Sequence, residues 1–207
     1  MDTTYFWRKY GITVFRSYEL RKNLLWKEVI RETKEDYVDG IRKLQEQGWD
    51  IVAIVCDGKK GLLWGFLEIP TQMCIFHQQQ IIRRYITKNP KLEANKELKD
   101  IVSMLGKVRE SMMQAWLEDW YRKYKIFLKE KNESGKYIHN RTRKAYRSLN
   151  TNLKHCYTFE RYKNKIEIPS TTNSLESTFS HLKQKIWLHR WLKKHRKLKL
   201  IDEFLWN

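Results

Sequence analysis

Cysteine is scarce in this chain, and the few copies present are poorly placed for cross-linking. The three cysteines, Cys56, Cys74 and Cys156, are widely spaced and include no CxxC pair. An odd, scattered set of this kind excludes a disulfide framework and a four-cysteine zinc site. We therefore expect reduced thiols, as in a cytoplasmic protein.

Long hydrophobic segments are also missing. The longest apolar runs, such as 51–56, are far shorter than the ~20 residues needed to cross a bilayer. No charged-then-apolar signal segment opens the chain, and no internal repeat or low-complexity linker interrupts it. These absences predict a cytoplasmic protein with no membrane partner.

Acidic residues are in deficit. The 207 residues include 24 Asp and Glu against 42 Lys and Arg, which gives a net charge of +18. Such a charge favours a polyanionic partner through phosphate neutralisation and counterion release, with nucleic acid ahead of acidic lipid. The hydrophobic content of 41% is enough for one large domain, with room for an inserted subdomain.

The first part of the chain has the pattern of a mixed α/β fold. Residues 3–7 and 12–16 are β-branched and aromatic runs joined by a turn ending in Gly11, which predicts a hairpin, and a third strand is expected at 24–30. Thr33 and Asp36 resemble a capping box at the start of a helix that ends at Gly48. The apolar run 51–56 then predicts a strand buried on both faces.

The rest of the chain is predicted to be mainly helical. A short helix around 62–67, a strand at 72–77 and a helix at 78–87 are expected first. From 89 to about 153 apolar residues recur at helical period, and Trp116 and Trp120 are expected in the core of these helices.

A later helix is predicted to start at Ser170 or Thr171 as its cap, and a basic amphipathic segment spans 191–206. The expected buried stripe of the later helix is Leu175, Phe179, Leu182 and Ile186.

Three acidic residues stand where phosphodiester chemistry needs carboxylates. Asp57 ends the apolar strand at the rim of a sheet, although Asp57-Gly58 also suits an ordinary turn. Glu176 flanks the apolar stripe of its helix, although a surface glutamate is common in a first turn. Asp2 precedes the first strand, where a frayed terminus is the alternative.

Three carboxylates together suit a pair of divalent cations. Two Mg²⁺ ions about 3.5–4 Å apart activate a water or 3′-hydroxyl and stabilise the leaving oxygen, and hard oxygen ligands hold them. Clustered carboxylates would repel one another without such ions.

Four short blocks give the chain a family resemblance over essentially its whole length. They are residues 2–6 (DTTYF), 56–62 (CDGKKGL), 72–77 (QMCIFH) and 172–177 (TNSLES). Each block is weak alone, but in this order the chain resembles the Mutator-like DDE transposases of bacterial insertion sequences.

The resemblance implies an RNase H-like mixed sheet flanked by helices, with an all-helical insertion before the glutamate-bearing helix. The implied parts are a core in 1–88, an insertion in 89–165 and C-terminal core helices in 166–207. Asp2, Asp57 and Glu176 would be the catalytic triad that holds Mg²⁺ or Mn²⁺ for DNA cleavage and strand transfer. The implied setting is the bacterial cytoplasm and nucleoid, with DNA and a second copy of the chain as partners.

Cys74-x-x-His77 also matches a family motif. Its spacing suggests half of a zinc site, but no second ligand pair is evident. The resemblance implies instead that Cys74 packs internally and that His77 lies near the active site, contacting DNA or orienting a carboxylate. A hydrogen-bonded histidine at a strand end is the alternative.

Several basic residues are candidates for DNA binding. Lys183 lies two helical turns after Glu176 on the same face. Phosphate contacts are also expected from Lys59, Lys60, Arg83 and Arg84. The run 189–199 interleaves cations with apolar residues and suits either a DNA-contacting helix or a solvated face.

The chain departs from the family at its start. Family members carry zinc-ligand cysteines and a helix-turn-helix ahead of the first catalytic aspartate, whereas Asp2 is here the second residue. We expect a truncated transposase with weak or no activity and impaired recognition of terminal repeats. A non-catalytic DNA-binding remnant and a metal-dependent nuclease are the alternatives.

Overall fold

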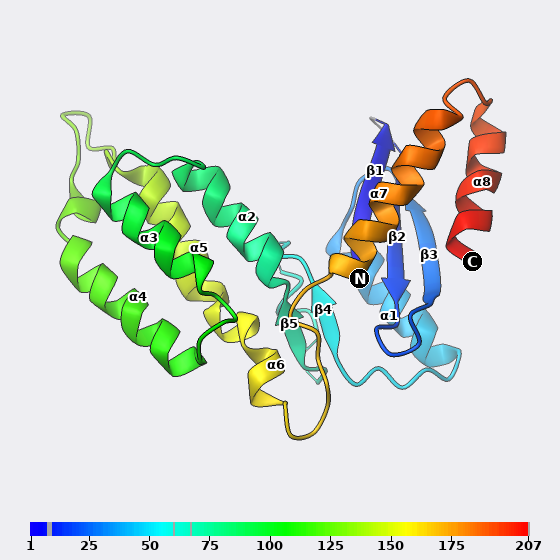
Figure 1. Ribbon diagram of the computed structural model, residues 1–207, viewed down its shortest axis with the longest axis horizontal. Coiled ribbons are helices and arrows are strands. Elements are labelled where there is room, and N and C mark those ends of the chain that lie inside the picture. The colour runs from blue at the N-terminus through cyan, green and yellow to red at the C-terminus, as the bar shows by residue number, and fades with distance from the viewer. Residues whose placement is uncertain (8–9, 60, 67, 207) are drawn as a thin grey trace. The chain divides into compact units, whose positions relative to one another are not determined.

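The computed structural model describes residues 1–7, 10–59, 61–66 and 68–206. It shows a mixed α/β protein that divides into two compact units (Figure 1). The first unit, here called the sheet unit, comprises 1–70 and 172–207, and the second, the helical unit, comprises 71–171. The helical unit is longer than the expected insertion at 89–165, because β5 and α2 pack against α5.

A three-stranded antiparallel sheet forms the centre of the sheet unit. Its strands are β1 (Asp2–Trp7), β2 (Tyr10–Arg16) and β3 (Asn23–Val29), in that order across the sheet. The register places Asp2 opposite Val14 on β2. The predicted hairpin and third strand are confirmed, with ends shifted by one or two residues.

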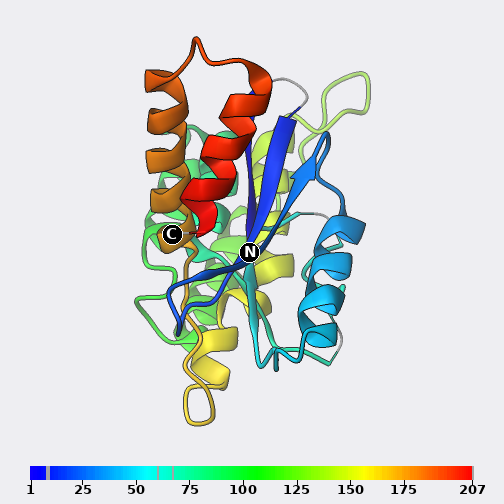
Figure 2. The same ribbon diagram turned by 90° about the vertical axis from the view of Figure 1, so that its right-hand side faces the viewer.

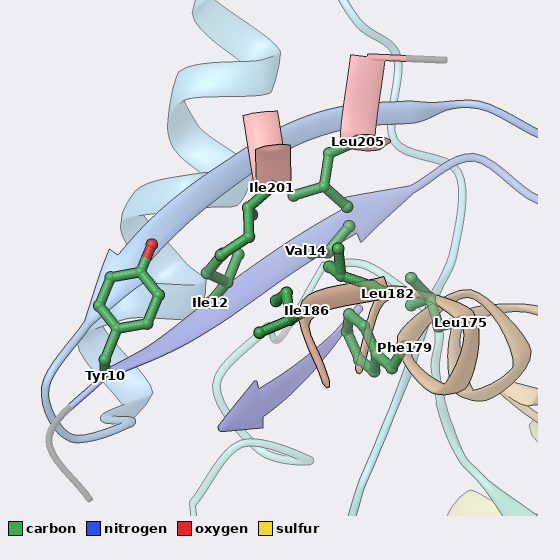
Figure 3. Packing of buried hydrophobic residues seen from close by; sticks show 9 residues of the cluster. All are labelled: Tyr10, Ile12, Val14, Leu175, Phe179, Leu182, Ile186, Ile201 and Leu205. Carbon is green, nitrogen blue, oxygen red and sulfur yellow. The ribbon is translucent and has the colours of Figure 1, made fainter. Parts of the chain in front are cut away.

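Both faces of β2 are buried, and its residues alternate between them. Tyr10, Ile12 and Val14 belong to a hydrophobic cluster that includes residues of α7 (Asn173–Leu188) and α8 (Lys194–Trp206). Figure 3 shows these side chains packed together, with Tyr10 at one end and Leu175 at the other. Phe15 is directed to the opposite face, where its ring contacts Tyr37.

Helix α1 (Lys34–Glu46) covers that opposite face, so that α1 and α7 flank the sheet on two sides (Figure 2). The predicted capping box is confirmed, because the Asp36 amide donates to Thr33 Oγ1 and the Thr33 amide donates to Asp36 Oδ2. Gly40 allows the close approach of α1, because a Cβ there would lie 2.0 Å from Cζ of Phe15.

Strand β4 (Ile54–Cys56) is shorter than predicted. The prediction that 51–56 is one strand buried on both faces is wrong for its first half, since Val52 is 54% exposed. The backbone nitrogen of Met1 donates to the Val55 carbonyl at 2.9 Å, which places the start of β1 beside β4.

The segment after β4 forms turns rather than the expected short helix. Leu62 and Leu63 are buried as core residues. Gly61 has φ = 82°, a left-handed conformation that a regular helix does not contain. Leu67 lies outside the described residues.

The helical unit contains one short strand followed by helices. The elements are β5 (Thr71–Met73), α2 (Ile75–Ile86), α3 (Glu93–Ser103), α4 (Glu110–Tyr124), the 3₁₀ helix η1 (Phe127–Lys129), α5 (Asn140–Cys156) and α6 (Thr158–Arg161). The prediction of a strand at 72–77 is wrong beyond Met73, and α2 starts three residues before the expected Gln78. The buried residues Ile75, Ile82 and Ile86 lie on one face of α2. Their spacing fits the period of a helix rather than the two-residue period of a strand.

The two tryptophans of α4 have different environments. Trp120 is a core residue, as predicted, and its indole Nε1 donates to the Ala94 carbonyl at 2.9 Å. Trp116 is 36% exposed, so its assignment to the core is wrong. The reason is that α4 buries only the face carrying Met113, Leu117 and Trp120.

Helix α7 confirms the predicted buried stripe of Leu175, Phe179, Leu182 and Ile186. Its N-cap is Thr172 rather than Ser170 or Thr171, and no side-chain hydrogen bond caps it. In the described part of the chain, every helix is too short or too polar to span a lipid bilayer.

Candidate functional site

Asp2 is an ordered residue of β1, in contrast to the frayed terminus considered as its alternative. The residue is 8% exposed, and Oδ1 accepts a hydrogen bond from the Thr3 amide at 2.8 Å. Because paired residues of an antiparallel sheet point to the same face, Asp2 faces the α7 side together with Val14.

Asp57 directly follows β4, in a loop that is stabilised by a hydrogen bond between the Asp57 side chain and a backbone amide. Asp57 Oδ1 accepts a hydrogen bond from the Lys59 amide at 3.1 Å. The backbone nitrogen of Met1 donates to the Val55 carbonyl. Asp2, at the start of β1, and Asp57, directly after β4, therefore belong to neighbouring segments of the sheet unit.

The Lys59 side chain is engaged by Glu32. Its Nζ lies 3.1 Å from Glu32 Oε2 and donates to the Glu32 carbonyl at 2.6 Å. Both side chains are mostly buried, at 26% and 18% exposed. This arrangement ties the Asp57 loop to the chain just before α1.

Tyr37 extends the same network under the sheet. Its hydroxyl donates to Glu32 Oε1 at 2.7 Å and is 2.7 Å from Thr3 Oγ1, which is in turn 2.7 Å from Thr13 Oγ1. Burial, reinforced by the negative charges of Glu32 and Asp57, raises the pKa of Tyr37 far above its ordinary value. The phenol therefore stays neutral and continues to donate to Glu32.

Glu176 lies in the first turn of α7, next to the buried Leu175. Its backbone amide donates to the Thr172 carbonyl at 3.2 Å, so it is part of the regular helix. A carboxylate in the first turn is stabilised by the helix dipole. Because α7 packs on β1, the helix carries Glu176 to the face of the sheet on which Asp2 lies.

The three carboxylates share this unit but are not gathered around one point. Among the described residues of the sheet unit, no three Asp, Glu, His or Cys side chains place ligand atoms all within 4.8 Å of one another. Ligand atoms within 4.8 Å of one another are close enough to bind one ion. A pair of ions about 3.5–4 Å apart allows its outer ligands to be roughly twice as far from each other.

The other predicted DNA-binding residues occupy several surfaces. Lys183 is exposed on α7, and Arg83 and Arg84 are exposed in the last turn of α2. The guanidinium of Arg141 donates to the carbonyls of Arg84 and Tyr85, which adds a third cation to that end of α2. Lys60 lies outside the described residues.

Cys74 and His77 belong to the start of α2 rather than to a strand. Cys74 is buried at the N-cap position, and His77 is half-buried in the first turn with its ring edge-on to Phe76. The alternative of a histidine at a strand end is therefore wrong, because the chain turns helical at Ile75.

The basic run 189–199 is divided between a turn and a helix. Its residues 194–199 begin α8, and Arg190 lies 5.3 Å from the ring of Trp187 and 5.1 Å from that of Trp191. Both tryptophans are well exposed, at 63% and 71%. The segment thus presents cations and aromatic rings on the surface.

Glu32 was not recognised from the sequence. Glu32 contacts Lys59, which is distant along the chain, and Tyr37, which lies on α1. No local motif marks Glu32 beyond its position before the capping box.

No family model matches the chain, and searches of curated proteins and of solved structures found no match either.

Proposed function

We propose that this chain is a DDE transposase catalytic core with an RNase H-like fold, which cleaves and transfers DNA strands with Asp2, Asp57 and Glu176 as ligands for Mg²⁺ or Mn²⁺. The helical unit would be the insertion between the last core strand and α7.

The observation that supports the proposal best is the placement of three carboxylates by neighbouring elements of the sheet unit. Asp2 faces the α7 side of β1, Glu176 lies in the first turn of α7, and Asp57 directly follows the strand that is bonded to Met1. An antiparallel sheet of β1, β2 and β3 with helices on both faces, and a hydrogen bond from Met1 to Val55 of β4, also fit the arrangement expected of an RNase H-like core.

The donor set suits hard divalent cations, because all three side chains offer carboxylate oxygens. When bound, a pair of such ions supplies an activated water or 3′-hydroxyl and stabilises the leaving oxygen. The chain's own contribution is to orient the ligands. The Thr3 amide orients Asp2, and the Lys59 amide orients Asp57.

The test is a Mg²⁺- or Mn²⁺-dependent assay of plasmid nicking and of joining a 3′-OH oligonucleotide to target DNA. Asp57→Asn and Glu176→Gln keep the shape of each side chain but remove its charge, and we expect each to lower both activities at least about 100-fold. Asp50→Asn is the matched control, because Asp50 is an exposed aspartate of the same unit. Activity that survives both substitutions would overturn the triad.

The same assay separates the alternatives. Nicking without joining of the 3′-OH end would indicate a nuclease. DNA binding without any metal-dependent nicking would indicate a non-catalytic remnant. Either result contradicts strand transfer by this chain.

A further inference from the structure

A cavity of about 500 Å³ opens in the helical unit, lined by α4, η1, the loop after η1 and α5. Its described lining contains five cations and three tyrosines but no acidic residue. This volume is in the ordinary range of ligand-binding sites. The composition indicates a ligand that is both anionic and aromatic.

One wall of the cavity is the end of a column of stacked rings. Trp120 lies at 5.5 Å and 21° to Tyr146, which lies at 4.9 Å and 13° to Tyr121. The rings run from the buried Trp120 to Tyr121, which is 39% exposed and lines the cavity. A base stacked on Tyr121 would continue a column that is already ordered by the core.

A second aromatic contact involves two other residues of the lining. The Arg143 guanidinium is 3.5 Å from the centre of the Tyr137 ring, and the same guanidinium donates to the Leu128 carbonyl. Arg143 is therefore held in place by the protein before any ligand binds, which lowers the entropic cost of binding a phosphate there.

Three of the four remaining cations of the lining lack an acidic ion-pair partner among the described residues. Lys125, Lys129 and Arg147 are exposed, and none of them forms an ion pair with another described residue. Charges without an acidic partner attract phosphate and release its counterions.

We propose that this cavity binds a single-stranded stretch of DNA, with a base stacked on Tyr121 and the adjoining phosphates on Lys125, Lys129 and Arg147. A single strand fits better than a duplex, because paired bases do not offer an open face to a protein ring. The inference does not rest on the metal-binding triad, since every residue of the cavity belongs to the helical unit.

The experiment measures the binding of the whole chain to a fluorescent oligo(dT), in EDTA so that metal chemistry plays no part. The probes are the oligonucleotide, a matched abasic strand, a duplex and an acidic peptide. Tyr121→Leu removes the ring, Tyr121→Phe keeps it, and Lys144→Ala is a control on exposed α5 surface outside the cavity.

We expect Tyr121→Leu to weaken oligo(dT) binding by about fivefold or more, while Tyr121→Phe and Lys144→Ala bind as the unchanged protein does. The abasic strand should bind weakly to all variants. Replacing Lys125, Lys129 and Arg147 together by Ala should reduce the slope of log affinity against log salt by about 2, at roughly 0.7 per phosphate contact.

The proposal is overturned if Tyr121→Leu binds oligo(dT) normally while its thermal unfolding is unchanged. It is also overturned if the duplex or the acidic peptide binds through the cavity cations as tightly as oligo(dT), since the site would then recognise charge alone.

Discussion

At the residue scale, the lysines of this chain differ in the contacts that their side chains make within the protein. Lys59 is engaged by the carboxylate and the carbonyl of Glu32, whereas Lys183 is exposed on α7. Removing a lysine that is paired and mostly buried destabilises the fold, because its partner is left with an uncompensated charge. An exposed lysine is available for DNA at small cost.

Substitution by Met should therefore separate these two roles. We expect Lys59→Met to lower the free energy of unfolding by about 1–2 kcal/mol, because Glu32 would keep a mostly buried charge without its partner. Lys183→Met should leave stability within about 0.5 kcal/mol and weaken DNA binding. Urea denaturation and DNA binding at one salt concentration check both variants, and an unchanged stability of Lys59→Met would contradict the structural role.

At the element scale, the N-terminus of α1 depends on Asp36. Burial alone would raise the pKa of this carboxyl, but hydrogen bonds from Lys27 and Thr33 outweigh it, and the pKa lies below its ordinary value. Lys27 Nζ is 2.7 Å from Asp36 Oδ1. A lowered folded-state pKa means that the ionised carboxylate stabilises the fold at neutral pH, and that this contribution is lost as the pH falls through the folded pKa.

We expect Asp36→Asn to destabilise the protein by about 1 kcal/mol near neutral pH, the usual value of a cap. The difference from the unchanged protein should begin to shrink below the ordinary aspartate pKa of about 3.9 and should be lost once the pH falls below the lower pKa of the folded carboxyl. Urea denaturation at the two pH values measures it. Asp39→Asn is the control, because Asp39 lies on the same helix with its side chain 49% exposed, and a pH-independent effect of Asp36→Asn would contradict the account.

Gly40 decides how closely α1 packs on the sheet. Alanine in a helix interior normally gains about 0.5–1 kcal/mol over glycine. Here the added Cβ would lie 2.0 Å from the Phe15 ring, and overpacking costs about 1–3 kcal/mol, so the clash should prevail. We expect Gly40→Ala to lower the thermal midpoint, and Phe15→Leu combined with it to cost less than the two changes added together.

Local patterns predicted most elements of the sheet unit, and long-range contacts account for the errors. The capping box at Thr33 and the stripe of α7 are formed within one helix, so spacing revealed both. The start of α2 was missed because its apolar run suits either period, and the helix is stabilised by α5.

The candidate site was predictable to a similar degree. Asp2, Asp57 and Glu176 could be named from the sequence, but the ion pair of Lys59 with Glu32 could not, because the two residues meet only in the folded chain.

At the scale of the whole molecule, the net charge of +18 dominates the expected behaviour. If about six phosphates are contacted, affinity for random duplex DNA should fall roughly 1,000-fold between 50 and 200 mM salt. Fluorescence anisotropy over that range measures the slope. Affinity that hardly changes with salt would show that DNA is not held by its phosphates.

The central claim is that Asp2, Asp57 and Glu176 are ligands of one pair of cations. Anomalous diffraction from crystals grown with Mn²⁺ tests it most directly. The account predicts two peaks about 3.5–4 Å apart, contacted by all three carboxylates. Crystals with Mn²⁺ elsewhere, or with the three carboxylates turned away from a common ion pair, would contradict it.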